Sequence, residues 1–594
     1  MWRYVVVLLL CLPAFADAPK NAYFGDLHIH TKYSFDAYIF GTTTNPDDAY
    51  AFARGQTIKH SAGIEMTIDR PLDFYAVTDH AMFLGQLNAL ENPEHPNHGD
   101  EEAEFFRTLE TVLDRGRAFG SFHIYLSEDY DTDAIRTAWE AIQDAANRHY
   151  QPSEFTTFIG YEYTSSYPVD NGNLHRNVIF ESDSVPPMPF SRIDNRNPEA
   201  LWAWMDRNRE QGIESIAIPH NSNGSNGHMF ELVKFDGSPL DSTYAETRMR
   251  NEPIIEISQV KGTSETHPVL SPNDEWAFFE IFPFRVAQHN RSQANGSYAR
   301  QAWRNGLTIE SSIGVNPYKF GVVAASDTHN SGEIFDEENF LGKIGHLDVR
   351  PIDRGSVPVG YEDNRPGYRD SASQYFSSAG IAGVWAEENT RESIFSAFRR
   401  KETFATSGTR IKVRFFAGYD MPEDILEQND FVEQAYAGGV PMGSTLSIEE
   451  TGSPIFLVWA MQDPLKTKLQ RVQIIKGWLE DNGTTHEQIF DVACSDGGVV
   501  DPETHRCPSN GASVDFSDCS QTPDVGASNL SAVWMDPTFN SEQDAFYYVR
   551  VLENPTCRWS TWDAVRNGTP VKQNLMQNRA IQERAWSSPI WLTP

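Results

Sequence analysis

Between residues 20 and 410, short apolar runs alternate with stretches whose apolar residues recur at helical spacing. Residues 133–150 and 198–211 show that spacing and predict helices. The apolar runs that predict strands are residues 73–78, 157–161, 215–219 and 320–325. Such alternation constrains the fold strongly, because it predicts a parallel sheet, either open or closed into a barrel, with helices against it.

Histidines and carboxylates stand where several of these strands end. The segments are Asp26-Leu27-His28-Ile29-His30, Thr78-Asp79-His80, Gly160-Tyr161-Glu162, Pro219-His220-Asn221 and Ser326-Asp327-Thr328-His329. His175 differs, because it precedes a strand. One such group alone would be explained as a satisfied polar residue of the core. Five segments together predict a shared site at the strand ends, where barrel enzymes build their active sites.

The first segment has the spacing of a chelating pair. Alternate residues of a strand point to one face, so Asp26, His28 and His30 should project together. Two imidazoles on one face can bind one metal ion, and a nearby carboxylate can orient a ring. We assign this orienting, catalytic role to Asp26 and to Asp79.

Imidazole with carboxylate is a ligand set for Zn, Mn or Fe, and it discriminates weakly among them. Enough ligands are present for two or three divalent metal ions. Clustered ions of this kind polarise a phosphoryl or acyl group and generate a hydroxide to attack it. The sequence therefore predicts a metal-dependent hydrolase.

The order of these motifs resembles the PHP (polymerase and histidinol phosphatase) superfamily over residues 23–330. The whole chain, from Tyr23-Phe-Gly-Asp-Leu-His-Ile-His-Thr to Val551-Leu-Glu-Asn-Pro-Thr, resembles an exported branch labelled domain of unknown function 3604. The resemblance implies a distorted (β/α)7 barrel with insertions that holds two or three metal ions. It also implies a phosphoesterase in which a metal-bridging hydroxide attacks phosphorus.

By the same resemblance, each residue of the site has an expected ligand role. One ion would take His28, His30, Glu162 and Asp327, a second would share Glu162 and add His175 and His220, and a third would take His80 and His329. Many relatives complete the third site with a further histidine, and here Asp36 stands at the matching position. Aspartate binds the same metals, so Asp36 is retained as a ligand.

Two other functions use the same residues. The first keeps the metal ions but cleaves an amide, a lactone or a sulfate ester. The second is a non-catalytic metal-binding scaffold of the envelope, although intact ligands at nearly every position argue against it. The substrate expected under the main hypothesis is a small anion, a phosphate ester.

The composition restricts the partners. The 594 residues carry a formal net charge of −35, so an exposed face for duplex nucleic acid is excluded. No apolar run is long enough to span a membrane. Arg3, the apolar residues 4–12 and the A-x-A sites that follow predict a signal peptide over residues 1–18 and export to the periplasm or beyond. The sequence carries no signal of oligomeric state.

After residue 410 the pattern changes to strands with little helix between them. Residues 411–416, 454–460, 469–475 and 545–552 predict these strands. We expect the barrel to occupy residues 19–410 and a smaller β-rich, sandwich-like domain to occupy residues 411–594. Four cysteines of this region suggest two disulfides. Cys494–Cys507 with Cys519–Cys557 is the preferred pairing among three possible connectivities.

Overall fold

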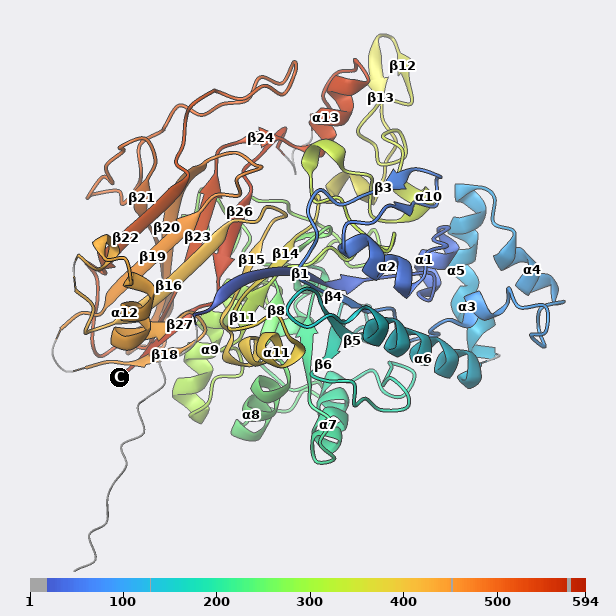
Figure 1. The fold of residues 1–594 in the computed structure, drawn as a ribbon, viewed down its shortest axis with the longest axis horizontal. Coiled ribbons are helices and arrows are strands. Elements are labelled where there is room, and N and C mark those ends of the chain that lie inside the picture. The colour runs from blue at the N-terminus through green and yellow to red at the C-terminus, as the bar shows by residue number, and fades with distance from the viewer. Residues whose placement is uncertain (1–18, 129, 423, 450–451, 574–577) are drawn as a thin grey trace, which may run out of the picture.

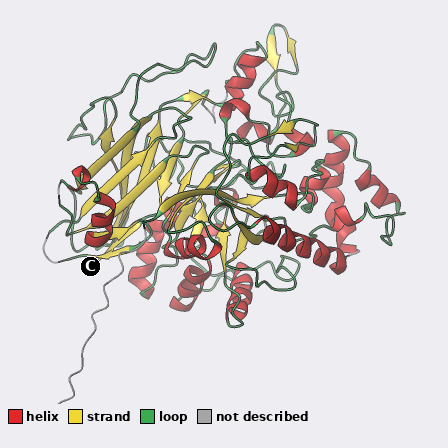
Figure 2. Cartoon of the chain, viewed as in Figure 1, coloured by secondary structure: helices red, strands yellow, loops and turns green. Residues whose placement is uncertain are grey.

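The computed structural model describes residues 19–128, 130–422, 424–449, 452–573 and 578–594. The predicted signal peptide, residues 1–18, lies outside these described residues. The described chain is a mixed α/β structure. Long strands gather on one side and most helices lie on the other side and below (Figure 2).

One large mixed sheet runs through the molecule in the order β18-β27-β23-β26-β15-β14-β1-β4-β5-β6-β7, and β20 joins it at β23 and carries β21. Its strands from the first part of the chain are β1 (Asn21–Ile29), β4 (Phe74–Val77), β5 (Thr156–Tyr163), β6 (Arg176–Phe180), β7 (Ser215–Pro219), β14 (Ile381–Ala386) and β15 (Thr403–Thr406). Its later strands are β18 (Thr445–Ser447), β20 (Leu469–Leu479), β21 (Thr485–Cys494), β23 (Ala545–Glu553), β26 (Arg584–Ser587) and β27 (Ile590–Thr593). Figure 1 shows β1 near the middle of this arrangement.

The sheet is not parallel throughout, so the predicted parallel sheet is corrected to a mixed one. Strands β1, β4 and β5 are parallel, whereas β6 is antiparallel to both β5 and β7, and β14 is antiparallel to β1. Parallel neighbours need a long crossover, usually a helix. Residues 164–175 join β5 to β6 without one, so the chain returns antiparallel.

Two short strands lead the sheet back towards β1. Strand β8 (Ile254–Glu256) lies beside β7 and pairs in parallel with β11 (Gly321–Val323). The chain after β11 then reaches β1, where Thr328 forms a parallel bridge with Ile29. The ends of β1, β4, β5, β7 and β11 are thereby brought around one centre.

Most helices of the described chain lie around these strands, although the last two along the chain lie against other elements (Figure 1). The helices are α1 (Phe35–Ile39), α2 (Pro46–Ala53), α3 (Gln86–Ala89), α4 (Glu101–Arg107), α5 (Val112–Glu128), α6 (Thr132–His149), α7 (Pro198–Arg209), α8 (Ser242–Asn251), α9 (Ala299–Ile313), α10 (Gly345–Asp348), α11 (Arg391–Arg400), α12 (Phe431–Gly438) and α13 (Trp559–Arg566). The two helices predicted from spacing are α6 and α7. Helix α6 buries Ile135, Trp139 and Ile142, and the Asn197 side chain caps α7 by accepting from the Glu199 N–H.

Short elements fill the long connections. The strands are β2 (Ile58–Lys59), β3 (Glu65–Met66), β9 (Ser258–Gln259), β10 (Gly262–Thr263), β12 (Gly360–Glu362), β13 (Arg365–Gly367), β24 (Thr556–Cys557) and β25 (Ala580–Ile581). The 3₁₀ turns are η1 (Ser222–Gly224), η2 (His228–Phe230), η3 (Glu337–Asn339), η4 (Ala372–Tyr375) and η5 (Ile425–Glu427).

A second sheet packs against the later strands of the large one. Its order is β17-β16-β19-β22. Its strands are β17 (Gly439–Pro441), β16 (Lys412–Gly418), β19 (Ile455–Met461) and β22 (Asn529–Met535). Phe415 and Phe456 of this sheet share one buried cluster with Tyr547 and Val549 of β23. The large sheet also crosses residue 410, because β15 pairs with β26. The division into domains at residue 410 stays a prediction.

Two disulfides tie the C-terminal region, and both match the preferred pairing. Cys494 is bonded to Cys507 and Cys519 to Cys557, each with a Cα–Cα distance of 5.6 Å.

Among the described residues, none of the helices combines the length and the hydropathy that a membrane crossing requires.

Candidate metal centre

The strand ends bring the predicted ligands into one buried cluster. His28 and His30 come from the end of β1, and His80 follows β4. The others are Glu162 in β5, His175 before β6, His220 after β7, and Asp327 and His329 after β11. All of these side chains are buried except His175, which is partly buried.

Glu162 lies between two groups of histidines. Its Oε2 is 3.4 Å from His28 Nε2, 3.3 Å from His30 Nε2 and 3.0 Å from His80 Nδ1. Its Oε1 is 2.6 Å from His175 Nδ1 and 3.7 Å from His220 Nε2. The two oxygens of one carboxylate thus face different imidazoles, which is the geometry of a ligand that two metal ions can share.

Asp327 completes the first group. Its Oδ1 lies 3.5 Å from His28 Nε2 and 3.4 Å from His30 Nε2. Asp327 adopts a left-handed backbone conformation (φ 57°), which is unusual for a residue other than glycine and is found often at functional sites. Its N–H donates to the His28 carbonyl (3.0 Å), so the backbone fixes the carboxylate against β1.

Several buried nitrogens at this centre make no hydrogen bond in the described structure. They are His28 Nε2, His30 Nε2, His220 Nδ1 and His220 Nε2. Buried polar atoms without a partner are costly, and a bound cation removes that cost. Each of the sets His28–His30–Asp327 and Glu162–His175–His220 offers ligand atoms within 4.8 Å of one another. These residues could hold metal ions.

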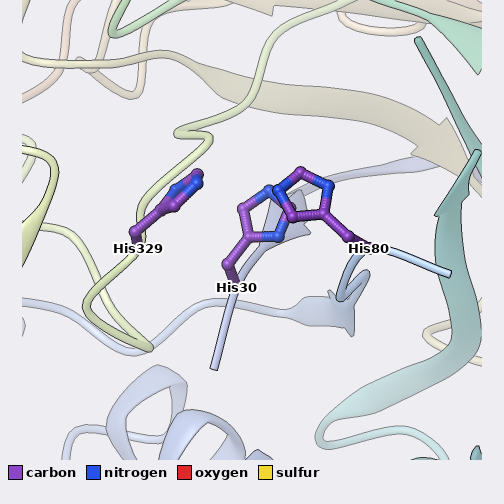
Figure 3. Close-up of side chains that lie close together, drawn as sticks. All are labelled: His30, His80 and His329. Carbon is purple, nitrogen blue, oxygen red and sulfur yellow. The ribbon is translucent and has the colours of Figure 1, made fainter. Parts of the chain in front are cut away.

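A third group lies on the other side of His30. His30, His80 and His329 offer nitrogens within 4.8 Å of one another, and Figure 3 shows their rings turned towards a common space. Asp36 faces the same rings, with its Oδ1 3.3 Å from His80 Nε2 and its Oδ2 2.8 Å from His329 Nε2. Asp36 therefore reaches both histidines of the expected third site, His80 and His329.

The charges of the cluster suit metal binding. Burial would raise the pKa of Glu162, but His80 and His175 hold it well below its usual range. Burial lowers the pKa of His175 to about 4 and that of His329 to about 3, so both rings are neutral. Ionised carboxylates and neutral imidazoles are the forms that coordinate metals. His80 differs: burial would lower its pKa, but Glu162 and Asp36 raise it to about 10.

Asp79 contacts the candidate ligand His30 indirectly, through Ser34. Its Oδ1 accepts from the Thr31 N–H (2.6 Å) and from the Ser34 hydroxyl (2.7 Å), and Ser34 Oγ lies 2.9 Å from His30 Nδ1. This chain of contacts fixes the His30 ring with Nε2 facing the cluster. Asp79 thereby orients a candidate ligand through Ser34.

Asp26 hydrogen-bonds to the backbone and not to a histidine ring. Its Oδ1 accepts from the backbone N–H groups of His28 (3.2 Å) and Ser326 (3.1 Å). It is fully buried, and burial raises its pKa to about 7. Asp26 therefore joins β1 to the chain that carries Asp327, and its place is structural support for the cluster.

Three further residues at the centre were not anticipated from the sequence. Glu256 Oε2, at the end of β8, lies 3.0 Å from His28 Nδ1. Lys343 Nζ lies 3.0 Å from Asp327 Oδ1 and 2.6 Å from His329 Nδ1, and Lys261 Nζ pairs with Asp327 Oδ2. Glu256 could have been noticed, because it too is a carboxylate after an apolar run (Pro253-Ile-Ile-Glu). The two lysines stand in connections without such a signal.

The centre opens into a cavity of about 870 Å³. His80, Glu162, His175, Asp327 and His329 form part of its wall, together with Lys261 and Lys343. Burial lowers the pKa of Lys343 to about 8, against the raising effect of Asp327. A small anion entering this cavity would meet two lysines beside the candidate ligands.

The family of the chain follows from its sequence match. The family model described as "Protein of unknown function (DUF3604)" matches residues 17–594. The chain belongs to the DUF3604 family. No curated protein is similar enough to this family member to count as a match.

One solved structure resembles the chain loosely. It is the crystal structure of a two-domain protein from Bacteroides vulgatus ATCC 8482 that contains a predicted PHP-like metal-dependent phosphoesterase. The two chains are 11% identical, and the match covers 89% of this chain and 90% of that one, with a TM-score of 0.27. So low a score tells nothing of the activity of this DUF3604 protein.

Proposed function

We propose that this chain is a metal-dependent hydrolase of phosphate esters. The observation that carries the proposal is Glu162, whose two carboxylate oxygens face separate groups of buried imidazoles. Neighbouring ring nitrogens of His28, His30 and His220 have no hydrogen-bond partner in the described structure. Bound cations would remove the cost of burying these nitrogens without a partner.

The ligand roles proposed here follow the three groups. The first ion would be held by His28, His30, Glu162 and Asp327, the second by Glu162, His175 and His220, and the third by Asp36, His80 and His329. Zn, Mn or Fe would suit these donors. When bound, such ions act as Lewis acids on a phosphoryl oxygen and lower the pKa of water to near neutrality.

Lys261 and Lys343 favour an anionic substrate. Both line the cavity beside Asp327, and Lys343 is fully buried. Their ammonium groups can donate to the outer oxygens of a phosphate dianion and hold it at the candidate ligands. A neutral amide or lactone would leave these two donors without such a partner, so we rank those substrates lower. A sulfate ester carries less charge and is separated from phosphate by the test below.

The order and pairing of the strands support a PHP-like architecture. We propose a distorted (β/α)7 barrel with insertions over residues 19–410, supported by the bridge between Ile29 and Thr328 that leads the strands back to β1. We propose a sandwich-like domain over residues 411–594, supported by the core that the second sheet shares with β23. Two disulfides agree with the proposed export to the periplasm or beyond.

The test combines metal content with turnover. Elemental analysis of the purified chain should find two or three divalent ions. Hydrolysis of p-nitrophenyl phosphate or bis-p-nitrophenyl phosphate should stop on chelation and return with Zn or Mn. His220→Ala should lose both metal and activity. His486→Ala, at a partly exposed histidine of β21, should keep both.

Two other results would redirect the proposal. Metal ions with hydrolysis of p-nitrophenyl sulfate but not of phosphates would assign the sulfate ester. Stable metal occupancy without turnover of phosphate, sulfate, amide or lactone substrates would assign the non-catalytic scaffold. Failure to bind any divalent ion would contradict the proposed centre itself.

A further inference from the structure

The cavity extends well beyond the candidate metal centre. Its volume of about 870 Å³ exceeds what a phosphate group can fill, so it has room for the rest of a substrate. Ligand pockets are usually apolar with a few polar groups that fix orientation. The chemistry of the cavity wall away from the metal centre therefore indicates the substrate class.

One wall is a row of neighbouring rings that begins at the candidate ligand His80. The Phe35 ring lies on the His80 ring, with centroids 4.9 Å apart and an angle of 24° between the planes. Phe122 of α5 lies on Phe35 at 4.3 Å and 12°. Phe119 follows one helical turn earlier, with its centroid 5.7 Å from that of Phe122. All four side chains line the cavity.

A second aromatic wall comes from different parts of the chain. Phe282 stacks on Phe376, with ring centroids 5.8 Å apart and an angle of 29° between the planes. Phe282 lies in the loop between β10 and α9, and Phe376 follows η4. Val286 lines the same cavity. Phe282 and Phe376 belong to a buried cluster separate from that of Phe35 and Phe122. Two independently built apolar walls thus line one cavity.

The wall also carries polar side chains outside the candidate ligand set, among them His123, Arg192, Gln288 and His289. Lys261 and Lys343 lie beside Asp327. Farther away, the cavity-lining Arg369 is paired with Asp353, with Nη1 2.5 Å from Oδ1. The cavity therefore has two lysines beside the candidate ligands, and two groups of aromatic side chains together with polar side chains in the rest of its wall.

We propose that the cavity selects phosphate monoesters of apolar, ring-bearing alcohols, namely aryl and arylalkyl phosphates. This inference rests on the proposed phosphoesterase function and names its substrate. In the reaction, water forms a bond to phosphorus and the bond between phosphorus and the ester oxygen breaks. The alcohol leaves with a proton, and inorganic phosphate is released.

Non-hydrolysable phosphonates test the class by binding alone. Isothermal titration calorimetry of the metal-loaded full chain would compare methylphosphonate, benzylphosphonate and 3,4-dihydroxybutylphosphonate. Methylphosphonate reports the metal centre without the walls. We expect benzylphosphonate to bind about tenfold more tightly or better, because its ring is buried against aromatic faces. The dihydroxybutyl compound should gain nothing, because its hydroxyl groups would be desolvated against apolar walls.

Two variants assign the preference to the walls. Phe122→Ala should remove most of the benzyl preference and leave methylphosphonate binding and metal content unchanged. Phe376→Leu, which keeps the bulk of the opposite wall but removes its ring, should weaken the preference partly. The matched control is Phe106→Ala, from the same buried cluster as Phe122 but outside the cavity wall. It should keep the preference.

Each contrary result has a distinct meaning. If methylphosphonate binds and benzylphosphonate binds no better, the inference is wrong and the proposed function stands. If the dihydroxybutyl compound or a nucleoside phosphonate binds best, the proposed substrate class is wrong, and the proposed phosphoesterase function again stands. An equal loss of preference in Phe106→Ala and Phe122→Ala would also overturn the role of the walls. If no phosphonate binds the metal-loaded chain, the proposed function and the substrate class both fail.

Discussion

At the scale of single residues, the centre depends on carboxylates whose two oxygens contact different partners. Glu162 faces two groups of histidines, and Asp327 faces His28 and His30 with one oxygen while Lys261 pairs with the other. A group in such a position cannot be replaced without unbalancing several partners. Neighbours that touch one ligand only are more informative to change, because their effects can be assigned.

Glu256 makes its ring contact with His28, and its carboxylate also lies within 4.8 Å of a nitrogen of His220. Its Oε2 lies 3.0 Å from His28 Nδ1, so the carboxylate can fix the ring and make Nε2 a stronger ligand. Burial, with Asp327 and Asp26 nearby, raises the pKa of Glu256 well above its usual range. Glu256→Gln keeps the shape but removes the ionisable carboxyl group. We expect metal affinity to fall by about 10- to 100-fold, measured by competition with a chromogenic chelator. Glu246→Gln, an exposed change on α8, should leave affinity unaltered, and an unaltered affinity in Glu256→Gln would refute the role.

Lys343 should have opposite effects on metal and on anion. Its ammonium group contacts Asp327 and His329, so as a cation it opposes metal binding at those residues, yet it can donate to phosphate. Lys343→Met is expected to raise metal affinity and to weaken inorganic phosphate binding by about tenfold. Calorimetric titration with each ligand measures the two effects separately. Lys319→Met, outside the cavity, is the control, and undiminished phosphate affinity in Lys343→Met would remove Lys343 from the anion site.

At the scale of elements, a buried carboxyl group joins η3 to α13. The Trp559 N–H, at the start of α13, donates to Glu337 Oε2. Burial and the nearby Glu280 raise the pKa of Glu337 to about 7, although Arg558 opposes the shift. A carboxyl with a raised pKa keeps its proton in the folded chain after the unfolded chain has released it. Its contribution to stability is therefore complete at low pH and is lost as the pH rises to about 7.

Glu337→Gln should remove this dependence. The free energy of unfolding of the parent chain should decline between pH 5 and pH 8, and the part due to Glu337 is at most about 3 kcal/mol. Urea titrations at both pH values would measure it. The neighbouring Glu338→Gln is the matched control, because Glu338 is exposed and paired with Arg566. If Glu337→Gln loses as much stability as the parent over this range, the assignment is wrong.

Local elements and the ligand pattern were accessible from the sequence. The 215–219 run is β7, and helix α6 lies within one residue of its predicted ends, because apolar spacing reflects local burial. The antiparallel direction of β6 could not be predicted from the sequence, because it depends on how the β5–β6 connection returns the chain to the sheet. Glu256 is the last residue of a three-residue strand, which is too short for a periodic signal. Lys343 reaches Asp327 only through a long, irregular connection.

At the scale of the whole molecule, the large sheet joins the candidate centre to the C-terminal strands. Strand β1, which carries His28 and His30, pairs with β14, β14 with β15, β15 with β26, and β26 with β23. No break separates the paired strands along this path. The metal centre and the C-terminal core should therefore share one cooperative unit, even though the sequence pattern changes near residue 410.

Metal binding should consequently protect both halves of the chain. A ligand that binds only the folded state stabilises it by about 4 kcal/mol at 1,000 times its Kd, which would raise Tm by about 3 °C for a chain of this length. Calorimetry should show one transition that moves as a whole with Zn or Mn. Hydrogen exchange should slow in β23 as well as in β1. If only β1 is protected, or if one of two transitions stays fixed, residues 411–594 unfold independently. The pairing of β15 with β26 would then be too weak to couple the two halves.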